Sequence, residues 1–126
     1  MSATDSAKQL LSIAAQAASE KGAIDPVALD VSGPLPLTEI FFIVSGRNER
    51  NVSAIASEIE DKLIESGTKP IRREGKAEGR WVLLDFGDLI VHVFHEEERL
   101  YYGLERLWKD CPVLPVPEFD ARPIDL

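Results

Sequence analysis

The sequence of 126 residues contains one cysteine, Cys111, so no disulfide can form within a single chain. A chain without internal disulfides is typical of a reducing compartment, and we expect a cytoplasmic protein. No apolar run approaches the roughly 18 residues that cross a bilayer. The first residues also lack the basic start and continuous apolar core of a signal peptide, so we expect no membrane partner.

Basic residues are outnumbered: 14 Lys and Arg stand against 22 Asp and Glu, which gives a net charge of −8. Affinity for nucleic acid depends on Lys and Arg side chains that neutralise phosphates, so we expect little direct contact with RNA. Opposite potentials steer association between proteins. The charge therefore favours a basic protein as the partner.

The hydrophobic pattern predicts one α/β (α+β) domain over residues 1–111. Helices are predicted at 5–21, 48–66 and 96–109, and strands at 27–31, 40–44, 68–73, 81–86 and 89–94. The order of these elements predicts a single mixed β-sheet of about five strands packed with helices. Pro70 argues for an edge position of the strand 68–73. The Pro-rich residues 112–126 are expected to form an extended or mobile tail.

Residues 81–94 predict a β-hairpin with a two-residue turn at Gly87-Asp88. This turn gives one purely apolar face, made by the pairs Phe86 with Leu89, Leu84 with Val91, and Val82 with Val93. The opposite face is apolar except for two polar residues, and consists of Trp81, Leu83, Asp85, Ile90, His92 and Phe94. Such a second face is covered either by its own domain or by a partner.

Asp85 and His92 lie diagonally across this second face, within reach of a hydrogen bond. They satisfy each other under the last helix, meet a partner, or form a catalytic dyad that would need a substrate pocket. A metal site is not expected, because His92 and His95 are three residues apart on a strand and point to opposite faces. The acidic run 96–98 suits the first turn of a helix without any role as a ligand.

The last predicted helix carries Leu100, Leu104, Leu107 and Trp108 along one face, which is typical of core packing. Tyr101 and Tyr102 cannot both lie at the centre of that stripe. At least one of them is expected at its margin, as an interface anchor or as a cover for the domain's own core.

Four segments resemble the ribosomal silencing factors, also called the RsfS, YbeB or Iojap family: LTEIFFIVSG, NVSAIASEIEDKL, EG followed by GRWVLLDFGDLIVHVF, and ERLYYGLERLWKDC. The resemblance implies a nucleotidyltransferase-like fold without the catalytic carboxylate cluster, and therefore no enzymatic activity and no cofactor. The sequence agrees, because Asp85 stands alone on its strand face and Asp88 lies in the turn, whereas two-metal chemistry needs clustered carboxylates.

The resemblance also implies a partner: the large ribosomal subunit, bound through a basic ribosomal protein (protein fourteen). Binding there sterically blocks subunit joining and represses translation under nutrient limitation. A homodimer is implied as well. The expected partner-binding residues are Trp81, Asp85, Asp88, His92, Glu96, Glu97, Arg99, Tyr101 and Tyr102. The alternative is a metal-dependent, nucleotidyltransferase-like protein that binds a nucleotide through Asp85 and Asp88.

Overall fold

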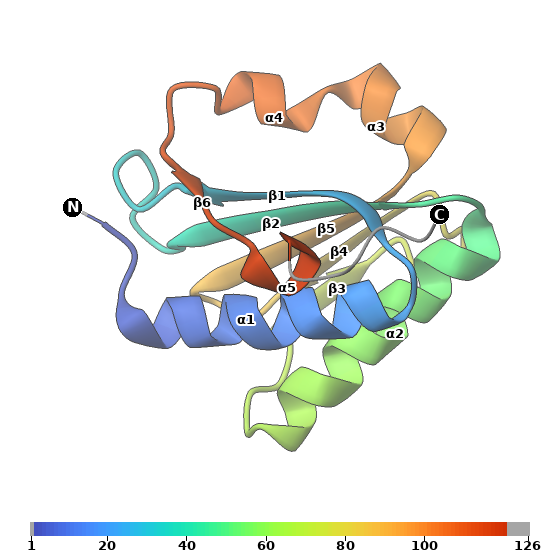
Figure 1. Ribbon diagram of the computed structural model, residues 1–126, viewed down its shortest axis with the longest axis horizontal. Helices are drawn as coiled ribbons and strands as arrows, with labels where there is room; N and C mark the ends of the chain where they lie inside the picture. Colours follow the sequence, from blue (N-terminus) through green and yellow to red (C-terminus); the bar gives the residue numbers. More distant parts are fainter. Residues whose placement is uncertain (1, 121–126) are drawn as a thin grey trace.

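Strand β2 (Ile40–Gly46) lies inside a mixed sheet, and all seven of its residues are buried. The computed structural model describes residues 2–120, and Figure 1 shows its sheet between two layers of helices. The other strands are β1 (Ile24–Asp30), β3 (Arg72–Glu74), β4 (Trp81–Asp85), β5 (Leu89–His95) and β6 (Val113–Leu114). The strand order is β3-β4-β5-β2-β1-β6. Strands β2 and β5 are parallel, and every other neighbouring pair is antiparallel. The predicted single mixed sheet is confirmed, with one strand more than the expected five.

Two long helices cover one face of the sheet, which we call the inner face (Figure 1). Helix α1 (Asp5–Glu20) begins after Thr4 and helix α2 (Glu49–Glu65) after Asn48, close to the predicted bounds. In each case the capping side chain accepts a hydrogen bond from a backbone N–H in the first turn, as N-caps do. The inner face holds the larger core, with Phe42, Leu84 and Val91 fully buried.

Two short helices lie over the opposite, outer face of the sheet: α3 (Glu96–Tyr102) and α4 (Leu104–Leu107) (Figure 1). The prediction of one continuous helix over 96–109 is wrong. Gly103 adopts the left-handed conformation, with φ 54° and ψ 44°, and ends α3. The break divides the predicted apolar stripe. Leu104 and Trp108 pack on the sheet, whereas Leu100 and Leu107 are 77% and 75% exposed.

The hairpin has the predicted register. Val82 pairs with Val93 and Leu84 with Val91, and the Phe86 N–H donates to the Leu89 carbonyl. Gly87 has a φ of 89°, which only glycine adopts readily, so this residue makes the tight turn possible.

The predicted edge strand is correctly placed but shifted along the chain: β3 begins at Arg72, after Pro70, and lies at the edge of the sheet. The end of the chain differs more from the expectation. Strand β6 pairs with β1, and helix α5 (Pro117–Asp120) packs against α1. Val116, between β6 and α5 in the chain, is buried in the larger core. Apolar residues between the prolines allow this packing, so the domain extends past residue 111. The remaining predicted tail, 121–126, lies outside the described residues.

Candidate functional site

The outer face of the sheet carries the side chains that the hairpin pattern predicts for it. Phe41 and Ile43 of β2 extend this face, together with Phe94 of β5, and all three are buried. Helix α4 covers part of it through Leu104 and Trp108. Leu83, Asp85 and Ile90 are only half-buried, so the hairpin end of the outer face stays accessible.

Trp81 organises an aromatic cluster at the other end of the hairpin. Its ring stacks on Phe94, with 4.8 Å between ring centroids, and contacts Tyr102 of α3 at the same separation. Its indole Nε1–H donates to Nδ1 of His92, 3.1 Å away. Trp81 is half-buried, so it joins α3 to the sheet and also contributes to the surface.

His92 is buried, and its side chain contacts other residues of the domain. Burial lowers the pKa of its imidazole to about 4, so the ring is neutral near pH 7. Because the indole donates to Nδ1, the proton of the neutral ring lies on Nε2, and that buried nitrogen has no partner among the described residues. The hydrogen bond between His92 and Asp85, one of the alternatives left open by the sequence, is not formed, because the Nε2–H that could donate to the carboxylate has no partner and Asp85 accepts from Gly87 instead. His92 therefore presents no polar group to a partner.

Asp85 instead shapes the hairpin turn. Its Oδ1 accepts a hydrogen bond from the Gly87 N–H at 2.8 Å, and its Oδ2 lies 3.9 Å from the Arg72 guanidinium of the edge strand. The short side chain of aspartate caps its own turn in this way because the turn N–H points back at it. Asp88 follows in the turn and is exposed. Both carboxylates lie at one end of the sheet.

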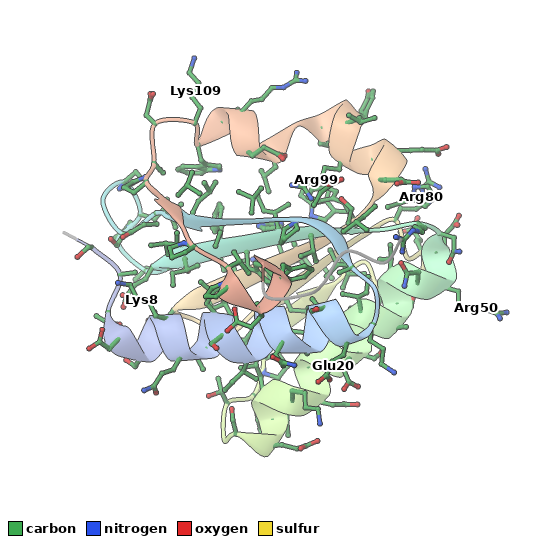
Figure 2. All side chains as sticks on the ribbon, viewed as in Figure 1. Lys8, Glu20, Arg50, Arg80, Arg99 and Lys109 are labelled. Carbon is green, nitrogen blue, oxygen red and sulfur yellow. The ribbon has the colours of Figure 1, made fainter. Side chains whose placement is uncertain are left out.

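Arg99 is buried and holds α3, α4 and the sheet together, as its labelled position between the sheet and α3 shows (Figure 2). Its guanidinium donates to Glu105 Oε2 at 3.1 and 3.0 Å and to Ser45 Oγ at 3.0 Å, and also to the carbonyl of Asp25. The sequence placed Arg99 on a partner surface. Its burial and its internal partners make it a positioning residue instead.

The negative charge in the first turn of α3 is partly neutralised by Arg80. Arg80 donates to Glu98 at 2.7 Å, to Glu97 at 3.2 Å and to Glu49 of α2 at 3.3 Å (Figure 2). These hydrogen bonds, that of Glu98 above all, raise the pKa of Arg80 further above its usual range. Glu96 and Glu97 are exposed, so their carboxylates face solvent at the helix N-terminus.

Helix α3 also exposes large apolar side chains. Tyr101 is 81% exposed, Tyr102 is about half exposed, and Leu100 stands beside them. Leu100 and Leu107 were missed by sequence reasoning, because a continuous helix would have buried them. The signal that was available is Gly103, whose position in the middle of the stripe is unfavourable for a helix interior.

The exposed side chains of α3 suit contact with another protein. In residues 2–120 no three His, Cys, Asp or Glu side chains are grouped so that they would hold a metal ion. Exposed aromatic side chains are typical anchors of protein–protein interfaces. None of the helices in the same part of the chain has the length and apolar content of a membrane span.

Comparison with known proteins identifies relatives along nearly the whole chain. The family described as "Ribosomal silencing factor during starvation" matches residues 4–125. The ribosomal silencing factor RsfS of Bacillus subtilis is 47% identical over 106 residues, which are 84% of this chain and 90% of that protein. The chloroplastic protein Iojap of Zea mays is 32% identical, over 86% of this chain and 46% of its own length.

Two solved structures have the same fold. A crystal structure of a protein from Chromobacterium violaceum superposes with a TM-score of 0.79 at 33% identity, covering 81% of this chain and 85% of that one. A crystal structure of a protein from Bacillus halodurans has a TM-score of 0.77 at 42% identity, covering 86% and 98%. The relation to nucleotidyltransferases stays a prediction. By its family match and by these relatives, the chain belongs to the ribosomal silencing factor family, RsfS.

Proposed function

We propose that this protein binds the large ribosomal subunit through a basic ribosomal protein, protein fourteen, and so prevents the small subunit from joining when nutrients are limiting. Membership of the silencing factor family supports the ribosome as the target. The net charge of −8 supports a basic protein as the contact and argues against extensive contact with RNA phosphates.

The observation that carries the proposal is the exposed apolar and aromatic surface of α3. Leu100 and Tyr101 project from the domain beside the exposed carboxylates of Glu96 and Glu97. Aromatic side chains supply contact area, and carboxylates at the rim attract Lys and Arg of a basic partner. We assign this surface, with Trp81 and Tyr102 behind it, to the ribosomal protein.

The mechanism is steric and needs no covalent chemistry. A bound domain of 126 residues on the joining face of the large subunit occupies space that the small subunit needs. The protein acts as a reversible repressor of translation and not as an enzyme. The nucleotide-binding alternative finds little support, since Asp85 caps its own turn and Asp88 points to solvent from that turn.

The same surface of α3 gives the protein a way to pair with its own copy. Leu100 and Tyr101 of α3 and Leu107 of α4 are each exposed, and burying them in a homodimer removes apolar area from water. A dimer that uses this surface competes with the ribosome, so it is a storage form.

Co-sedimentation with separated ribosomal subunits tests the proposal. We expect the protein to pellet with the large subunit and to stay in the supernatant with the small one. Tyr101→Ser should weaken binding at least tenfold, because it removes an exposed contact without touching the core. Ile64→Ser, on the far side of the sheet in α2, is the matched control and should bind normally. Pelleting with neither subunit would refute the proposal.

A further inference from the structure

A groove of about 240 Å³ opens at the turn end of the hairpin, away from α3. Leu35 and Leu37 from the loop before β2 line it together with Gly87 and Ile90 of the hairpin, and Asp85 contributes the one charged group of this lining. Leu37 is 87% exposed, and nothing within the described residues covers its side chain. The groove therefore combines an apolar wall with a single carboxylate.

The walls of the groove are held in place by backbone hydrogen bonds. The N–H groups of Glu39 and Ile40 both donate to the carbonyl of Asp88 at 3.0 Å, which ties the loop that carries Leu37 to the hairpin turn. The Leu35 N–H donates to the Val31 carbonyl, also at 3.0 Å. A groove whose walls are fixed in this way loses little entropy when it binds a side chain.

The carboxylate of Asp85 retains capacity for a cation. Its Oδ1 is used by the turn, but its Oδ2 has only the Arg72 guanidinium at 3.9 Å, longer than a hydrogen bond. Arg72 is more than half exposed and is shared with Glu74 at 3.3 Å, so it holds Asp85 weakly. The side chain of Asp85 is itself only 20% exposed, and partial burial strengthens its attraction for a positive charge.

The size of the groove favours one protruding side chain. It is smaller than the roughly 300–1,000 Å³ of typical small-molecule sites. Lysine and arginine lay an apolar stem along apolar surface and place the charge at its end, which matches leucine and isoleucine walls that lead to a carboxylate. The exposed Asp88 next to the groove is a second negative charge that attracts the same cationic side chain.

We propose that this groove, lined by Leu35, Leu37, Asp85 and Ile90, receives one lysine or arginine side chain of the basic ribosomal protein. The assignment rests on the proposed function and adds to it a second contact, separate from the aromatic surface of α3. The stem packs between Leu37 and Ile90, and the cationic head donates to Asp85 Oδ2. The occupied groove fixes the orientation of the domain on the subunit.

Binding to purified large ribosomal subunits, measured as a function of salt concentration, tests this assignment. Asp85→Asn removes the charge but leaves a side-chain oxygen for the Gly87 N–H, so the turn is kept. It should weaken binding about tenfold and reduce the salt dependence. Leu37→Ser should weaken binding about fivefold without changing the salt dependence. Asp61→Asn, which removes the same charge from exposed α2, is the control and should bind like the unmodified protein.

The outcomes separate the groove from the proposed function. If the unmodified protein binds the subunit and both groove variants bind equally well, the groove assignment is wrong and the proposed function stands. If the unmodified protein does not bind, both fail. Arg72→Gln should bind as well or better, since it removes a competing cation. Weaker binding of Arg72→Gln, with Asp85→Asn unaffected, would indicate contact with RNA phosphate and overturn the assignment. Loss of self-association alone in Asp85→Asn would assign the groove to a second copy.

Discussion

The indole Nε1–H of Trp81 donates to Nδ1 of His92 across two neighbouring strands, at 3.1 Å. This contact sets the tautomer of a buried histidine and the orientation of an aromatic ring that reaches the surface. It also means that Trp81 is unsuitable as a pure binding probe. Removing it would take a stacking partner from Phe94 and leave His92 without a donor.

His92 makes stability depend on pH. The unfolded chain binds the His92 proton near pH 6.5, whereas the folded protein binds it only near pH 4, because burial disfavours the charged ring. As pH falls, the unfolded state therefore takes up the proton at a higher pH than the folded state does. The free energy of unfolding should fall as pH drops from about 6.5 to about 4. The loss should reach about 3 kcal/mol and be absent above pH 7.

Urea unfolding at pH 7 and at pH 4.5 measures this loss, with His92→Asn as the reference. Asparagine offers an oxygen to the Trp81 indole but does not titrate in this range, so the difference between the two proteins isolates His92. Parallel stability curves for both proteins would show that His92 is not held neutral by the fold.

Arg99 and Glu105 should be energetically coupled. Arg99→Met leaves the Glu105 carboxylate without its guanidinium partner, and we expect the free energy of unfolding to drop by about 2–3 kcal/mol. The double variant Arg99→Met with Glu105→Leu should recover part of that loss, because no unpaired charge remains. Thermal or urea unfolding of the double-mutant cycle gives the coupling energy. Additive effects of the two substitutions would contradict the ion pair.

Gly75 and Gly67 form a matched pair for testing the turn that precedes the hairpin. Both have positive φ, 85° and 103°, so alanine is strained at either position. A Cβ on Gly75 would lie 1.9 Å from the carbonyl oxygen of Trp81, whereas one on Gly67 meets nothing within 4 Å. Gly75→Ala should therefore destabilise the protein by at least about 2 kcal/mol more than Gly67→Ala in the same unfolding assay. Equal losses would show that the backbones are not that close.

Local patterns were sufficient to predict the sheet and the hairpin, and the errors came from one overlooked glycine and from contacts between distant segments. Gly87-Asp88 fixes which residues pair, so the two faces of the hairpin followed from alternation alone. The continuous helix failed at Gly103, because a left-handed residue was not anticipated within a good helical stripe. Strand β6 was missed because a two-residue strand between prolines has no pattern of its own and depends on β1.

The residues of the candidate site show the same difference between local patterns and distant contacts. At least one of Tyr101 and Tyr102 was expected at the margin of the helix, and both are exposed. Arg99 was misplaced because its partners come from three separate segments, including Ser45, which lies 54 residues earlier in the chain. His92 and Asp85 are neighbours on the sheet, but Trp81 and Gly87 offer them better-placed donors.

The central claim is that the bound protein keeps the subunits apart, and light scattering of recombining subunits tests it most directly. Large subunits are first saturated with the protein, and small subunits are then added at a magnesium concentration that allows joining. We predict that the increase in scattering is strongly suppressed, and that the Tyr101→Ser variant restores it. Normal joining, with the protein still bound to the large subunit, would contradict the steric mechanism.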